Sequence, residues 1–237
     1  WSMPGLGDYA LGLAEDETLW SFTKMWRANR TTRQLMAGTD IRFIDVEMQD
    51  KFTGRLETLI DEFRGADLVA WLTNQSWPES PFTFADAPDF IKGEEHLAKW
   101  LRFINSDRNQ VDQAKLSELP LIRTINNHLV YPDDRVLRCD DDDDRAMLQS
   151  LKLSFVHQEW VTDDDIWAVY HLAGVETLYP RHVIATLPAT LDQWRNLPVD
   201  KMINQLGRLF GYFSRHLRKL TDYDRLTLRN LPLCVTQ

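Results

Sequence analysis

The chain lacks the features that mark secreted and membrane-spanning proteins. It has two cysteines, Cys139 and Cys234, in 237 residues, which is too few for a disulfide scaffold. We expect two reduced thiols, with one disulfide bridge as the alternative. No apolar run approaches the ~18 residues that a membrane-spanning helix needs, and residues 1–5 lack the basic and apolar blocks of a signal peptide. These absences predict a soluble, cytoplasmic protein.

The sequence motifs of the common enzyme classes are missing as well. The chain contains no GxGxxG, GxxxxGK[ST], HExxH or GxSxG pattern. Its six histidines are scattered, and the spacing of histidines and cysteines matches no zinc site. Cys139 stands next to a run of aspartates, whose charge disfavours a thiolate nucleophile. We therefore predict no catalytic residue and no cofactor, and we favour a protein without enzymatic activity.

The composition supports a packed core and shows an uneven distribution of charge. Hydrophobic residues make up 43% of the chain and aromatic residues 11%, including nine tryptophans, which is too apolar for a disordered protein. The net charge is −9, which argues against nucleic-acid binding by the whole protein. Residues 201–237, however, carry seven Lys and Arg against two Asp. An acidic body with a basic end favours a docking element, because charge asymmetry acts on association more than on fold.

Hydrophobic periodicity predicts an α+β fold that is mainly α-helical, a helical body with a few short strands. Apolar residues recur at helical spacing in the segments 16–37, 51–64, 94–105, 145–156, 162–174 and 198–220. A strand on either side of the second segment would make a small βαβ unit near residues 41–72. Residues 121–139 predict a β-hairpin with its turn at 131–134, and Thr221 predicts the cap of a further short helix.

The domain organisation is predicted from the absence of a clear linker. We expect a single domain of residues 1–237. The alternative is an N-terminal subdomain, 1–73, and a helical subdomain, 93–237, joined by segment 74–92. That segment is the best candidate for a boundary because its prolines break regular structure.

The same segment is rich in aromatic residues. We interpret it as a loop pinned to the body of the protein by its aromatic side chains. The alternative is a binding loop that presents Trp77 and Phe82 to a partner, because loops often carry binding residues. Both residues are therefore included among the candidate partner-binding residues.

The clearest candidate binding surface is the amphipathic segment 198–220. At about 100° per residue, its apolar residues fall on one side, which we expect to seal the core. That side comprises Val199, Met202, Ile203, Leu206, Leu209, Phe210, Phe213, Leu217 and Leu220. The opposite side carries the basic residues Lys201, Arg208, Arg215, Arg218 and Lys219. A solvated surface is the plain interpretation of the basic side, and an acidic protein surface, nucleic acid or anionic lipid are the ligands that it would otherwise bind.

A run of five carboxylates, Asp140 to Asp144, precedes Arg145. Mutual repulsion makes such a run costly to bury, so we expect a solvated loop or a helix start, where negative charge is favourable. A metal site is the first alternative, because Asp140, Asp141 and Asp144 have the DDxxD spacing with which carboxylates bind Mg²⁺. The second alternative pairs the run with the basic helix, within one chain or between copies.

Together these patterns predict a non-catalytic, protein-binding accessory, adaptor or inhibitor subunit of a larger assembly. It would dock through charged surfaces on another protein with an acidic surface, without membrane insertion. Tryptophan and arginine, which are abundant here, are residues that interfaces favour. The predicted partner-binding residues are Lys201, Arg208, Arg215, Arg218, Lys219, Trp77 and Phe82. A magnesium-dependent enzyme that uses the aspartate run is the first alternative, and a nucleic-acid-binding protein that uses the basic helix is the second.

Overall fold

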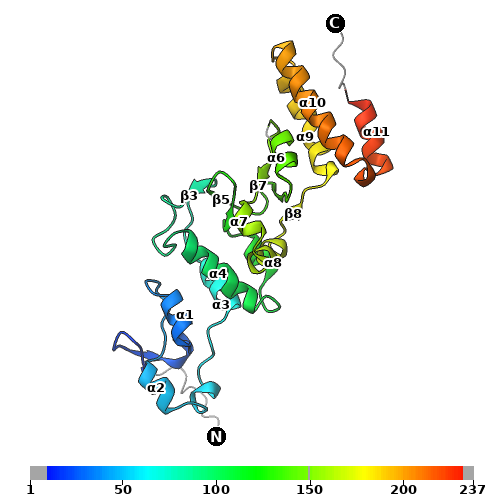
Figure 1. The fold of residues 1–237 in the computed structure, drawn as a ribbon. Coiled ribbons are helices and arrows are strands. Elements are labelled where there is room, and N and C mark those ends of the chain that lie inside the picture. Colours follow the sequence, from blue (N-terminus) through cyan, green and yellow to red (C-terminus); the bar gives the residue numbers. More distant parts are fainter. Residues whose placement is uncertain (1–9, 149, 232–237) are drawn as a thin grey trace. The chain divides into compact units, whose positions relative to one another are not determined.

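The computed structural model of the chain describes residues 10–148 and 150–231. Helices account for 49% of the structure and short strands for 12%, which confirms the mainly α-helical α+β class (Figure 1). Within the described ranges, no helix is both long enough and apolar enough to cross a membrane.

The chain divides into two compact units. The first consists of the residues up to Pro78 together with Phe84–Leu116, and the second of Glu79–Thr83 together with the residues from Ser117 onward. A short piece of the predicted boundary segment thus belongs to the second unit while its flanks belong to the first. The prediction of a single domain stays a prediction.

The first unit is built from short elements around a small core. Strands β1 and β2 pair antiparallel, and Leu13 lies opposite Leu19. The elements are β1 (Ala10–Leu13), β2 (Leu19–Ser21), η2 (Phe22–Lys24), α1 (Arg30–Leu35), α2 (Val46–Lys51), η3 (Leu56–Thr58), α3 (Gly65–Leu72), α4 (Glu94–Ser106) and, at its end, α5 (Gln113–Ser117). One core cluster is formed by Ala14, Met25, Ile44, Leu56 and Ile60. The predicted helix 94–105 is confirmed as α4.

The predicted helix 16–37 is wrong. Its first half forms the β1–β2 hairpin, and only α1 is helical in its second half. The hairpin turns at Glu17, whose φ of 61° lies in the left-handed region. Beside it, Asp16 accepts hydrogen bonds from Thr18 and so stabilises the turn instead of starting a helix.

The predicted βαβ unit at 41–72 is also wrong. Residues Phe43 and Ile44 make only isolated bridges, and the apolar run 68–72 lies inside helix α3. The periodicity of apolar residues alone does not distinguish a short buried strand from a buried helix turn. Gly65 begins α3, and a Cβ there would lie 2.8 Å from the Cα of Ile104 on α4. Close packing of two helices therefore explains this glycine.

The second unit combines two small sheets with a helical C-terminal part. Strand order is β3–β5–β4 in the antiparallel sheet and β7–β6–β8 in the parallel sheet. The strands are β3 (Phe82–Thr83), β4 (Ile122–Arg123), β5 (His128–Val130), β6 (Val136–Arg138), β7 (Ser154–Phe155) and β8 (Glu176–Thr177). The helices are α6 (Asp142–Leu148), α7 (Gln158–Val161), α8 (Asp164–Leu172), α9 (Pro180–Trp194), α10 (Val199–Arg215), η4 (Leu217–Lys219) and α11 (Asp222–Asn230).

The hairpin predicted in residues 121–139 is present as β4 and β5, but its turn is misplaced. The chain reverses at 124–127, with Asn127 at φ 60°, and 131–134 leads instead to β6 in the other sheet. Since β6 and β7 are parallel neighbours joined through α6, a strand–helix–strand arrangement does occur here. It lies at 136–155 and not near 41–72.

Helix ends in the second unit follow their capping residues. Asp163 caps α8, one residue after the expected Thr162, and Gly174 follows its end with φ 101°. Thr221 makes the predicted capping box with Asp224 at the start of α11. The predicted helix 145–156 is shorter and ends at Leu148. Helix α9 has no counterpart in the sequence prediction, because Pro180 and Pro188 interrupt its pattern.

Candidate functional site

Helix α10 contributes one side of its apolar face to the core of the second unit. Leu206, Leu209 and Phe213 are 7%, 1% and 6% exposed and belong to a cluster with side chains of β6, α6 and α9. The helix begins directly after Pro198 and is followed by η4, so it ends earlier than the predicted residue 220. This part of the face seals the core as expected.

The other side of the apolar face is uncovered. Val199, Ile203 and Phe210 are 59%, 55% and 50% exposed, and Leu217 in η4 is 55% exposed. The expectation that the entire apolar side seals the core is therefore wrong for these residues. They lie at one edge of the face, which the neighbouring elements do not reach. Contiguous exposed apolar side chains of this kind mark interaction surfaces more often than isolated ones do.

Four of the five predicted basic residues are exposed and unpaired. Among the described residues, no ion pair is formed by Lys201, Arg208, Arg218 or Lys219. Arg215 differs, since its guanidinium lies 2.8 Å from Asp141, 3.4 Å from Asp143 and 3.3 Å from Asp144. It holds the C-terminal end of α10 against α6 and is less available to a partner than the other four.

The aspartate run forms the start of α6, as one interpretation of the sequence predicted. Asp141 accepts hydrogen bonds from the backbone N–H groups of Asp143 (2.9 Å) and Asp144 (3.1 Å), which satisfies the free donors of the first turn. These bonds and the Arg215 guanidinium lower the pKa of Asp141. The run is thus a helix start that also pairs with the basic helix within the same chain.

One carboxylate of the run, Asp144, is buried. Its side chain is 6% exposed, and its Oδ2 lies 2.5 Å from Nε2 of His216. Burial raises the pKa of the neighbouring Tyr212 well above its usual range, and the negative charge of Asp144 is a further cause.

Burial also raises the pKa of the Cys139 thiol, whose Sγ donates a hydrogen bond to the backbone oxygen of Asp141 at 3.4 Å. Burial is thus a larger cause of the raised pKa of Cys139 than the charges of the aspartates. Cys234 lies outside the described residues.

The three residues of the proposed metal spacing do not converge on one point. Asp140 is bound to Arg138 at 2.8 Å, whereas Asp141 and Asp144 face Arg215. Within residues 10–148 and 150–231, no group of three His, Cys, Asp or Glu side chains is placed to hold a metal ion. Asp141 and Asp144 instead pair with the guanidinium of Arg215, which a metal ion would have to displace.

Millimolar Mg²⁺ is accordingly expected to leave the melting temperature unchanged. A specific site would raise it, because a ligand that binds only the folded state stabilises that state. Thermal-shift measurements with MgCl₂ and, as the ionic-strength control, an equivalent concentration of NaCl separate the two outcomes. A rise with Mg²⁺ alone that is lost in Asp141→Asn would restore the metal alternative.

The two aromatic candidates occupy different environments. Phe82 is 4% exposed and lies in β3 opposite Leu129, so its proposed contact with a partner is wrong. Trp77 is partly buried, donates from Nε1 to the backbone oxygen of Leu72 at 3.1 Å and lies edge-on to Phe90. The pinned-loop interpretation describes both better than the binding-loop interpretation.

A groove runs beside the exposed apolar row of α10. Its volume is about 890 Å³, and one wall is Met147 of α6. Ile203, Gly207 and the cations Lys201 and Arg208 also line it. Sequence periodicity predicted that Lys201 and Arg208 face away from the core, but not that Ile203 stays uncovered.

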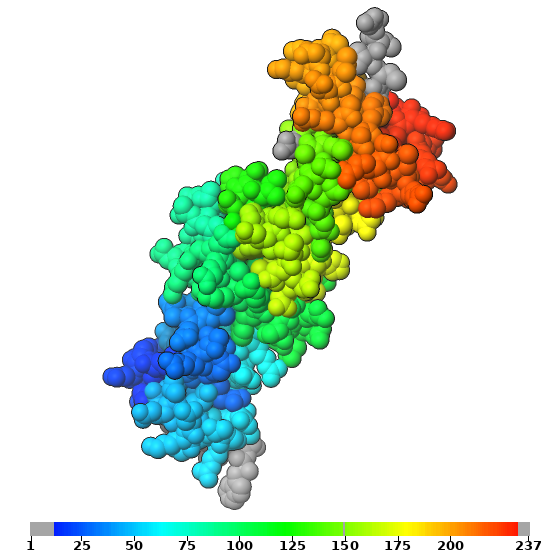
Figure 2. Space-filling view, in the orientation of Figure 1, coloured from blue at the N-terminus to red at the C-terminus, as the bar shows by residue number. Residues whose placement is uncertain are grey.

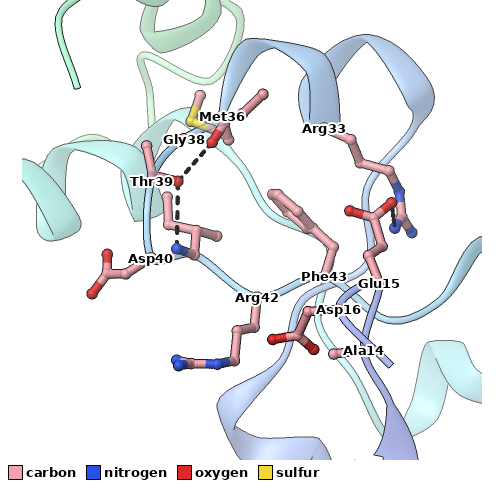
Figure 3. Close-up of a pocket in the computed structure, with 12 residues that line it drawn as sticks. Ala14, Glu15, Asp16, Arg33, Met36, Gly38, Thr39, Asp40, Arg42 and Phe43 are labelled. Carbon is pink, nitrogen blue, oxygen red and sulfur yellow. Dashed lines mark hydrogen bonds and ion pairs between the residues drawn. The ribbon is translucent and has the colours of Figure 1, made fainter. Parts of the chain in front are cut away.

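The first unit has a smaller, polar pocket of about 390 Å³ (Figure 3). Arg33, at one end, is 8% exposed and bound to Glu15 at 2.6 Å. Arg42 stacks on Trp20 with 3.8 Å between guanidinium carbon and ring centroid, and this cation lowers the pKa of Asp16, after the stronger effect of the Thr18 hydrogen bonds. The pocket's two arginines thus hold neighbouring elements together.

No protein family model, no curated protein and no solved structure matches this chain. The function is therefore argued from the geometry of the two units alone.

Proposed function

We propose that this protein is a non-catalytic binding subunit that docks on an acidic surface of another protein through α10. The observation that supports this most is the set of exposed, unpaired cations on α10 and the following η4, together with the exposed apolar row of α10. Cations are expected on any solvent-exposed helix surface, whereas the exposed apolar side chains of Ile203 and Phe210 are not. Apolar centres with arginine at their edges are typical of interfaces.

Reversing the four free cations is expected to abolish partner binding without unfolding the protein. The variant is Lys201→Glu, Arg208→Glu, Arg218→Glu and Lys219→Glu, with Arg215 kept because it is part of the fold. Exposed substitutions of this kind change stability by about 0.5 kcal/mol each or less. Affinity purification from the source cells, with quantitative mass spectrometry, measures the loss of bound proteins, and thermal unfolding measures stability.

A second variant with the same change in net charge is the control. It carries Lys24→Glu, Lys51→Glu, Lys115→Glu and Lys152→Glu, all of which are exposed and belong to neither α10 nor η4. The control should retain every partner that the α10 variant loses. Equal loss in both variants would show a general charge effect and would contradict the proposal, and a partner released by nuclease treatment would favour the nucleic-acid alternative.

A further inference from the structure

We infer that the groove on α10 binds an acidic, amphipathic α-helix of another protein, which crosses α10 at Gly207. This inference rests on the proposed function and adds the form of the partner segment. In Figure 2, much of the surface of α10, drawn in orange, is open on the face in view.

The exposed apolar residues lie along one side of α10. Val199, Ile203 and Phe210 are four and seven residues apart, so they form one row along the helix. Two helices pack by placing the ridges of one into the grooves of the other. A partner helix with apolar residues at i, i+3 or i+4, and i+7 presents the matching row.

Gly207 marks where the two helix axes would approach most closely. A Cβ at this position would have no heavy atom within 4 Å, so packing in the unit does not require glycine here. The residue nevertheless lowers helix propensity. At Gly211, one turn later, a Cβ would meet Sδ of Met147 at 3.4 Å, so that glycine contacts α6. Gly207 alone leaves free space on the groove floor for the backbone of a partner.

The charges at the groove select an acidic partner over a second copy of this chain. Lys201 and Arg208 line the groove, and neither forms an ion pair with a described residue. A two-fold contact between α10 helices would place these cations near their own equivalents. Like charges at an interface oppose association, whereas an acidic helix would neutralise them.

The inference is tested by selecting helices against the full chain. The probe is a phage-displayed library of amphipathic helices of about 20 residues, with a fixed apolar stripe and random charges on the polar face. We expect enrichment of acidic members. Their affinity, measured by fluorescence anisotropy with synthetic peptides, should fall about tenfold or more for Ile203→Ser and for Phe210→Ser. Gly207→Ala should also weaken binding while its melting temperature stays the same or rises.

Leu226→Ser on α11 is the matched control, because Leu226 is 57% exposed and lies outside the groove. It should bind the selected peptides as the unchanged protein does. Enrichment without acidic bias, or full affinity in the variants of Ile203, Gly207 and the neighbouring Phe210, would overturn the inference. So would a dimer in sedimentation velocity that Ile203→Ser dissociates. If charge reversal removes cellular partners but the groove variants keep them, the proposed function stands and the helix inference fails.

Discussion

Replacing Arg33 by alanine is expected to lower the free energy of unfolding of the first unit by about 3–5 kcal/mol. The guanidinium donates to the backbone oxygens of Ala28 (2.9 Å) and Ile44 (2.6 Å), and to the side chains of Glu15 (2.6 Å) and Gln49 (2.7 Å). Alanine removes the guanidinium donor from the buried carbonyl of Ile44, at about 1–3 kcal/mol, while the carbonyl of Ala28 keeps Nε2 of Gln49 at 3.2 Å. Urea unfolding measures the loss, and hydrogen exchange should show it within residues 10–63.

Arg30→Ala is the control, because Arg30 lies three residues earlier on α1 and is exposed. It should change the free energy of unfolding by no more than about 0.5 kcal/mol. Arg33→Lys should recover only part of the loss, since a single ammonium group cannot reproduce the planar fork that reaches four acceptors. Equal stability of the Arg33→Ala and Arg30→Ala variants would show that these hydrogen bonds contribute nothing net.

Arg33 also shows why much of the first unit could not be predicted from the sequence. Arg33 lies in the predicted helix 16–37, where the apolar pattern gives no sign that an arginine is buried. Its burial depends on acceptors from Glu15, Ile44 and Gln49, which follow other elements and have no fixed spacing from it. Periodicity describes which residues share a face of a regular element. Periodicity does not predict the structure of hairpins and single helical turns that are held in place by such long-range hydrogen bonds.

Two of the long periodic segments, 94–105 and 198–220, were predicted well because the helix itself sets their pattern, whereas 16–37 and 51–64 form no continuous helix. Helices α4 and α10 follow their apolar spacing, and Thr221 caps α11 as predicted. How much of each apolar helix face is buried could not be predicted, because it depends on which other elements pack against the helix. Leu206 and Phe210 belong to the same predicted face, yet one is 7% and the other 50% exposed. The candidate surface is therefore a product of tertiary packing that the pattern alone does not contain.

Replacing Asp144 by alanine is expected to lower the free energy of unfolding of the second unit by about 3 kcal/mol. The substitution removes the carboxylate 2.5 Å from His216 and 3.3 Å from Arg215. His216 is 16% exposed and would lose its partner in a site that water reaches poorly. Arg215 keeps Asp141, so we place the loss at the lower end of the range for broken buried pairs. Chemical unfolding gives the free energy, and hydrogen exchange should increase at the end of α10.

Asp143→Ala removes the same charge from the neighbouring position and serves as the control. The Asp143 side chain is 78% exposed and lies 3.4 Å from Arg215, so its loss should cost about 0.5 kcal/mol or less. Asp144→Asn keeps the shape and one acceptor oxygen, and its stability should lie between those of the unchanged protein and the alanine variant. If the Asp143 and Asp144 variants were equally stable, the buried contact between Asp144 and His216 would contribute nothing net to stability. Arg215 and Asp141 would then be the ion pair that links the aspartate run to α10.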